Sequence, residues 1–274
     1  MAQHTTPKVH MGTITGGEGR ALYAQNPVIL LPMGSQEDQG PHAPMGDYLL
    51  AEKIAELAAI KATNAGTPTV VAPVIPFGGV DFFGAMPGGI AVSEATLVSI
   101  IRDMIASLHR HGLTRLIVIN GHGGNVGPIN VATRETFHAT GHQIPSLYLW
   151  RIGYALLPAI VGAETSRAVS GHGADPLSSI GMHLFPELMR PDMIPTPKPL
   201  GHNKALDLPY TALGSLNFEG AEVTVPTEYD EVYSQGVGKG DPNLCTPATG
   251  AALTEQLSTL VARFAAHFAG RTST

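Results

Sequence analysis

The sequence predicts an α/β protein of three layers, in which helices cover both faces of a mostly parallel central sheet. Short apolar runs of strand length alternate along the chain with runs whose apolar residues recur at helical spacing. Polar clusters directly follow apolar runs, as expected where ligands bind at the carboxyl ends of parallel strands. No stretch has the composition of a linker, so we expect residues 1–274 to form one domain.

Four apolar runs are predicted to be the strands of the sheet. Each has four to seven residues, which is typical of a strand, and helical patterns lie between most of them. In chain order the predicted strands are Val28–Leu31, Thr69–Ile75, Leu116–Ile119 and Ser146–Leu149.

Two amphipathic helices are predicted between these strands. In the first, apolar residues recur at helical spacing over 49–57, and the pattern ends near Asn64, a residue type that stops helices. In the second, Ser93 can cap the first turn, an apolar stripe runs over 97–108, and Gly112 ends the pattern.

The last third of the chain has a different character. Over residues 186–247 the periodic pattern gives way to prolines and glycines, with short extended pieces such as Glu222–Val225. We expect this stretch to be mostly loop, and loops of such length usually serve function or subunit contacts. A final helix is predicted from about Pro247 to Phe268.

Composition excludes several classes of function. The net charge of −6 and the absence of a Lys/Arg cluster argue against a nucleic-acid partner. Residues 1–10 lack the apolar stretch of a secretory signal, and no run approaches the ~20 apolar residues of a membrane span, so we expect a cytoplasmic protein without membrane contact. The single cysteine, Cys245, excludes an intramolecular disulfide and a thiolate metal cage.

Three polar clusters carry the candidate chemistry, and the first two directly follow predicted strands. Carboxylates and a neutral imidazole from separate strand ends can converge on one divalent cation, as in hydrolytic metal centres. The clusters are GSQEDQGPHAPMGD (34–47) with Glu37, Asp38, His42 and Asp47, NGHGGN (120–125) with His122, and SGHGADPLSS (170–179) with His172 and Asp175.

Each of these residues also has a purely structural interpretation. Asp47 directly precedes a predicted helix and can be its N-cap. His122 can be a hydrogen-bonded histidine in a glycine-rich turn, and His172 can hydrogen-bond Asp175 in support of other groups. The combination of three clusters favours the metal site.

The three clusters, in this order and spacing, resemble the creatininase (creatinine amidohydrolase) family. The resemblance extends through PVIPFG (73–78), FFGAMPGGIAVS (82–93) and GDPNLCTPATG (240–250), and so covers nearly the whole chain. It implies a three-layer α/β/α fold and a metal-dependent hydrolase of cyclic or linear amides, assembled as a homo-oligomer that is a hexamer in relatives.

The resemblance also implies a set of metal ligands. Glu37, Asp47 and His122 match the ligands of the first metal, and Asp47 would bridge to a second. The family's histidine ligand for the second metal is replaced by Gln39, a poorer ligand for Zn²⁺ or Mn²⁺. Asp175 matches an acidic residue of many relatives and is a candidate ligand there. We therefore expect one or two divalent cations per subunit, Zn²⁺ or Mn²⁺, with Fe²⁺ as a further candidate.

The expected reaction is metal-assisted hydrolysis of a small cyclic amide, imide or lactone. His172 matches a histidine beside the substrate in the family and suits general acid catalysis, with Asp175 orienting it or supporting a second metal. Gly171 and Leu177 replace acidic residues of the family, which argues against creatinine as the substrate. The alternatives are a deformylase or peptidase reaction at the same centre and a metal-binding scaffold without catalysis.

Overall fold

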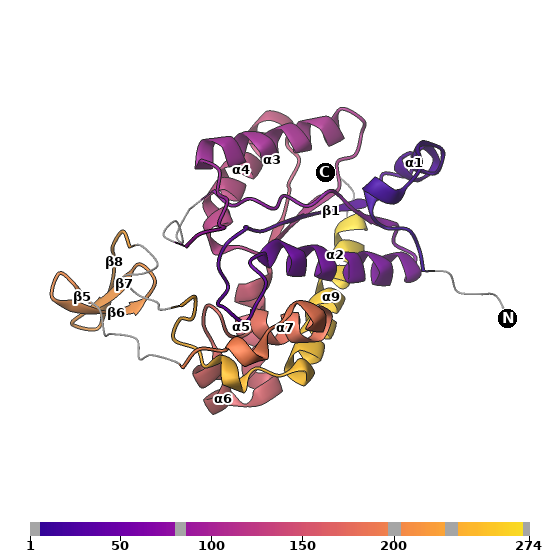
Figure 1. Cartoon of the computed structure of the whole chain (residues 1–274). Coiled ribbons are helices and arrows are strands. Elements are labelled where there is room, and N and C mark those ends of the chain that lie inside the picture. Colours follow the sequence, from indigo (N-terminus) through magenta and orange to yellow (C-terminus); the bar gives the residue numbers. More distant parts are fainter. Residues whose placement is uncertain (1–5, 80–85, 197–203, 228–234, 271–274) are drawn as a thin grey trace.

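The computed structural model describes residues 6–79, 86–196, 204–227 and 235–270. Its centre is a sheet of four parallel strands in the order β2-β1-β3-β4 (Figure 1). This sheet confirms the predicted fold class. The strands are β1 (Val28–Met33), β2 (Thr69–Val71), β3 (Leu116–Asn120) and β4 (Ser146–Tyr148).

Two strands are shorter than the apolar runs that predicted them. β2 ends at Val71 rather than at Ile75, because Pro73 has no N–H to donate to the neighbouring strand. The chain returns to the sheet at Ile75, which pairs with Met33 in an isolated bridge. β4 ends at Tyr148, where the next helix begins.

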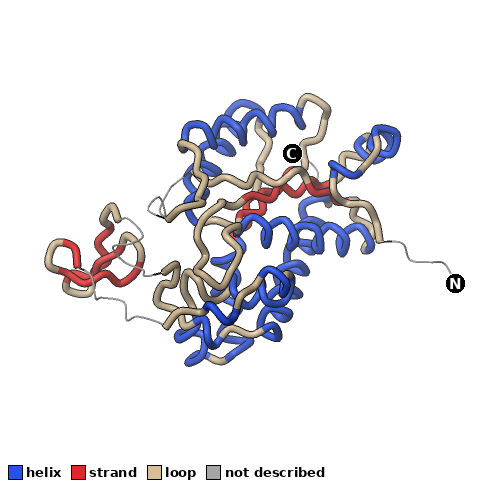
Figure 2. The backbone as a smooth tube through the Cα atoms, in the orientation of Figure 1, coloured by secondary structure: helices blue, strands red, loops and turns tan. Residues whose placement is uncertain are grey.

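Helices cover both faces of the sheet and complete the three layers (Figures 1 and 2). Successive residues of a strand point to opposite faces, so Leu30 and Ile117 pack into one core while Ile29 and Val118 pack into the other. The first face is covered by α2 (Asp47–Asn64), α5 (Leu149–Val161), α7 (Leu177–Leu184) and α9 (Pro247–Ala269), and the second by α3 (Glu94–His109) and α4 (Val126–Thr140).

The helix ends follow the signals in the sequence. The hydroxyl of Ser93 accepts the N–H of Thr96 and caps α3. Thr246 caps α9 in the same way, ahead of Pro247 at the first helical position. Shorter helices are α1 (Gly16–Tyr23) and α6 (Ala163–Val169). No helix in the described part of the chain is both long and apolar enough to cross a membrane.

The stretch 186–247, predicted to be mostly loop, contains a small antiparallel sheet (Figure 2). The extended piece predicted at Glu222–Val225 is confirmed by a strand at Ala221–Thr224, but the sheet to which it belongs was not predicted. Its strands have two to five residues, and Tyr210 and Leu216 are the buried residues among them, so their alternating pattern is too weak to identify strands. The strands pair in chain order and are β5 (Lys204–Ala205), β6 (Leu208–Ala212), β7 (Ser215–Phe218) and β8 (Ala221–Thr224).

Candidate metal centre

Three candidate ligands meet at the carboxyl end of the central sheet. Glu37 lies in the loop after β1, Asp47 is the first residue of α2, and His122 follows β3. One ligand atom of each lies within 4.8 Å of the others, and all three residues are buried. Nδ1 of His122 is 3.2 Å from Oε1 of Glu37 and 3.1 Å from Oδ2 of Asp47. Two carboxylates and an imidazole arranged in this way suit a divalent cation.

Asp47 is held by the backbone of the first cluster. Its Oδ1 accepts the N–H of Ser35 at 2.6 Å, and Gly46, not Asp47, occupies the N-cap of α2. The capping interpretation of Asp47 is therefore wrong. Gly34 is required beside it, because a Cβ there would overlap Oδ1 of Asp47 and lie 2.6 Å from the backbone nitrogen of Tyr48.

The backbone around His122 is fixed by two neighbouring side chains. Asn120 accepts the N–H of His122 at 3.0 Å and donates to its carbonyl at 2.7 Å. The indole Nε1 of Trp150 donates to the carbonyl of Gly121. These bonds fix the backbone at His122, so that its imidazole is held toward Glu37 and Asp47.

Burial and mutual charge shift the pKa values of all three groups. For His122, burial favours the neutral ring, but the carboxylates of Glu37 and Asp47 outweigh it and raise the pKa to about 10. Burial raises the pKa of Asp47 to about 7, against the hydrogen bond and charge of His122. Burial also opposes ionisation of Glu37, yet the charge of His122 holds the pKa of Glu37 below its ordinary value. The group binds a proton that a cation would displace.

The donor set of this group fits a divalent cation. Oε2 of Glu37 and Nε2 of His122 are buried without a hydrogen-bond partner, which is costly for polar atoms that have left water. Gln39 is also buried beside them, and its Nε2 donates to Oε1 of Glu37 at 2.9 Å. Gln39 thus supports a ligand carboxylate, while its own Oε1 has no hydrogen-bond partner.

His172, from the third cluster, lines the same cavity as the three ligands. Its Nε2 lies 2.7 Å from the backbone carbonyl of Asp38. Because a carbonyl can only accept, Nε2 carries the proton and Nδ1 is the acceptor nitrogen of the neutral ring. Burial lowers the pKa of His172 below its ordinary value, so the ring is neutral near pH 7.

Asp175 is not brought to this cavity. Its Oδ1 accepts the N–H of Ser179 in the first turns of α7 at 2.9 Å, and its carboxylate also interacts with the thiol of Cys245. Burial raises the pKa of Asp175. Asp175 was predicted as a ligand and catalytic group, whereas the structure places its carboxylate at the start of α7. The ring of His172 donates its hydrogen bond to the carbonyl of Asp38 and not to Asp175.

The cavity at the ligands has a volume of about 180 Å³. Tyr148, Trp150, Tyr154 and Leu213 line it together with the predicted residues. Leu213 lies in the turn between β6 and β7, within the stretch expected to be loop, and nothing in its sequence context marks it as a site residue. Only the position of the small sheet reveals its role in the cavity.

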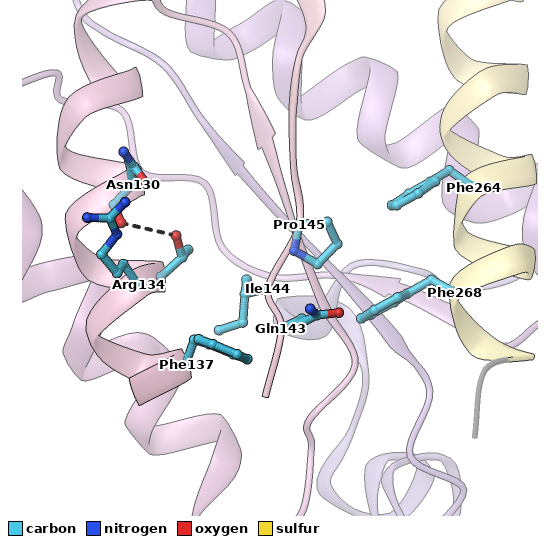
Figure 3. Close-up of a pocket in the computed structure, with 9 residues that line it drawn as sticks. Asn130, Arg134, Phe137, Gln143, Ile144, Pro145, Phe264 and Phe268 are labelled. Atoms are coloured by element: carbon cyan, nitrogen blue, oxygen red, sulfur yellow. Dashed lines mark hydrogen bonds between the residues drawn. The ribbon is translucent and has the colours of Figure 1, made fainter. Parts of the chain in front are cut away.

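A larger hollow of about 420 Å³ lies between α4 and α9 (Figure 3). Its wall contains the rings of Phe137, Phe264 and Phe268, and the positively charged residue in the wall is Arg134. None of its lining residues is a carboxylate or a histidine, so the hollow lacks the ligands found at the smaller cavity. The smaller cavity is therefore the candidate site.

Known proteins resemble this chain in sequence and in fold. The family profile described as creatininase (creatinine amidohydrolase) matches residues 13–265. A mycofactocin precursor peptide peptidase of Mycolicibacterium smegmatis is 31% identical over 124 residues, which are 44% of this chain and 49% of that protein. The creatinine amidohydrolase of Pseudomonas putida is 28% identical over 204 residues, or 68% of this chain and 75% of that protein.

A solved structure of creatinine amidohydrolase (creatininase) superposes with a TM-score of 0.74 at 20% identity, over 97% of this chain and 99% of that one. At this identity the likeness supports the fold. The family profile, in contrast, spans most of the chain and includes the loops that carry Glu37, Asp47 and His122. The chain therefore belongs to the creatininase family.

Proposed function

We propose that this protein is a metal-dependent hydrolase that opens a small cyclic amide, imide or lactone. The observation that carries the proposal is the convergence of Glu37, Asp47 and His122, all buried, at the carboxyl edge of the sheet. Their oxygen and nitrogen atoms suit Zn²⁺ or Mn²⁺, with Fe²⁺ as a further candidate. We assign one cation to this group, and a second per subunit would need ligands from outside it.

When bound, such a cation lowers the pKa of a water molecule and polarises a substrate carbonyl. The side chains of the cavity then have separate tasks. Glu37 and Asp47 supply negative charge and His122 supplies a neutral nitrogen. His172 moves the proton: its Nδ1 accepts a proton from water, and the protonated ring then donates to the departing nitrogen or oxygen. The carbonyl of Asp38 fixes the ring of His172 for both steps.

The size of the cavity supports a small substrate. Its volume of about 180 Å³ is below the roughly 300–1,000 Å³ of sites that bind drug-sized ligands. A second candidate is a linear amide, in a deformylase or peptidase reaction, which the 31% identity to a peptide peptidase favours. A scaffold that binds metal without catalysis would show the cation and no turnover.

The test combines metal content with turnover. Protein purified without chelator is analysed for bound metal and assayed against cyclic amides, imides, lactones, formamides and short peptides. We expect bound cation and hydrolysis of a cyclic substrate, loss of the cation in Glu37→Gln, and loss of turnover with the cation retained in His172→Asn. Hydrolysis of linear amides alone would favour the second candidate. Absence of bound metal would overturn the proposal.

We further propose a cytoplasmic homo-oligomer, with a hexamer as the assembly to test. The family membership supports the oligomer. Light scattering on the purified protein measures the mass directly, and a monomer of 28.7 kDa at assay concentrations would contradict this part of the proposal.

A further inference from the structure

The cavity at the ligand group has an apolar side that the proposed hydrolysis does not itself require. Tyr148 at the end of β4, Trp150 and Tyr154 in α5, Leu177 at the start of α7 and Leu213 in the β6–β7 turn all line it. Three aromatic rings and two leucines offer a large apolar surface for so small a cavity. We refer to these five residues as the apolar wall.

The charges of the cavity point in the same direction. Glu37 and Asp47 are its carboxylates, and neither Lys nor Arg lines it in the described part of the chain. A divalent cation on the ligand group would be balanced by the two carboxylates, which leaves no net positive charge for an anionic substrate. Arg151 follows Trp150 in α5, but its side chain is exposed and does not line the cavity.

Hydrogen bonds order the backbone on both sides of the apolar wall. The indole of Trp150 donates to the carbonyl of Gly121. Leu213 lies in a turn of the small sheet, in which Tyr210 and Leu216 are buried and the N–H of Val225 donates to the carbonyl of Gly214 at 2.9 Å. An apolar surface that is already ordered loses little conformational entropy when a matching group binds to it.

Resting on the proposed function, we propose that the apolar wall selects an uncharged substrate whose carbonyl carries a planar apolar group. Leu213 is then a specificity-determining residue, because it comes from the small sheet and takes no part in binding the cation. A substrate with a carboxylate or phosphate beside its carbonyl would meet apolar side chains and the carboxylates of Glu37 or Asp47, and no Lys or Arg among the described lining residues.

Hydroxamates test this inference without knowledge of the natural substrate, because the hydroxamate group chelates divalent metal ions. Binding of acetohydroxamate, benzohydroxamate and 4-carboxybenzohydroxamate to the metal-loaded protein is measured by calorimetry. We expect benzohydroxamate to bind about tenfold or more tightly than acetohydroxamate, and the carboxylated compound to bind more weakly than benzohydroxamate. Leu213→Ala should reduce the ratio of benzohydroxamate to acetohydroxamate affinity several-fold.

Leu206→Ala is the matched control, because Leu206 lies in the β5–β6 turn of the same small sheet, is 75% exposed and does not line the cavity. The affinity ratio should be unchanged in this variant. Equal affinities for the two uncharged hydroxamates, no binding of either, tighter binding of the carboxylated one, or an unchanged ratio in Leu213→Ala would overturn the inference. If the binding pattern holds but no amide, imide or lactone is hydrolysed, the proposed function fails while the apolar wall stands.

Discussion

The side-chain amide of Gln39 donates to Oε1 of Glu37 at 2.9 Å, the same oxygen that faces Nδ1 of His122. Gln39 therefore takes part in the ligand group as a hydrogen-bond donor to a ligand. An imidazole in its place would offer a nitrogen of much higher affinity for Zn²⁺ or Mn²⁺. In this structure residue 39 therefore supports a ligand of the first ion, whereas a histidine at the same position would be able to bind a second ion.

We expect Gln39→His to raise the number of bound cations from one to two per subunit. The added imidazole supplies the ligand that the neutral amide does not. Elemental analysis together with native mass spectrometry measures the count, and Gln39→Leu is the control that should stay at one. Two ions per subunit in the unaltered protein would show that Gln39, or another group, already serves a second site.

Asp175→Ala should leave the metal content unchanged and lower stability. Oδ1 of Asp175 accepts the N–H of Ser179, and leaving a buried donor without its partner costs about 1–3 kcal/mol. Thermal unfolding and elemental analysis on the same sample measure both effects, with Glu37→Gln as the variant that should lose the cation. A drop in metal content in Asp175→Ala would restore the ligand role suggested by the resemblance.

Gly34→Ala should remove the cation and reduce stability, because its Cβ would displace the carboxylate of Asp47 or the backbone at Tyr48. The matched control is Gly17→Ala in α1, where a Cβ has nothing within 4 Å. That variant should gain up to about 1 kcal/mol from better helix propensity. Metal content and thermal unfolding measure both. Normal metal binding in Gly34→Ala would mean that the first cluster relaxes more easily than its contacts indicate.

The sequence predicts the central architecture because the responsible signals are periodic. The buried strands β1 and β3 and the capped helix α3 each have a pattern that a local window contains, and Ser93 caps α3 as expected. The meeting of the first two polar clusters also follows, since each comes after a parallel strand at the same edge of the sheet. The choice of Glu37, Asp47 and His122 among the cluster residues came from the resemblance to the creatininase family.

The remaining features depend on contacts that no periodicity encodes. Asp175 lies in a loop whose backbone directs its carboxylate to the N–H of Ser179. The small sheet has too few buried residues to show an alternating pattern. Leu213 reaches the cavity through the placement of that sheet. Such long-range placement is set by tertiary packing and becomes visible in the structure.

Cation binding should release protons, with an affinity that rises with pH. The carboxylates of Glu37 and Asp47 raise the pKa of His122 to about 10, so the metal-free ring is protonated at pH 7 to 8 and a cation must displace that proton. We expect release of about one proton per cation at pH 8 and an apparent affinity that rises about tenfold per pH unit. Below pH 7 the rise should steepen, because Asp47, whose burial raises its pKa to about 7, then also loses a proton.

Calorimetric titration of the metal-free protein in two buffers of different ionisation enthalpy measures this proton release directly. His111→Gln is the control, since His111 is exposed and lies outside the cavity, and it should release the same number of protons. Binding without proton release at pH 8 would mean that His122 is neutral before the cation arrives, and that the carboxylates do not hold the ring in its charged form.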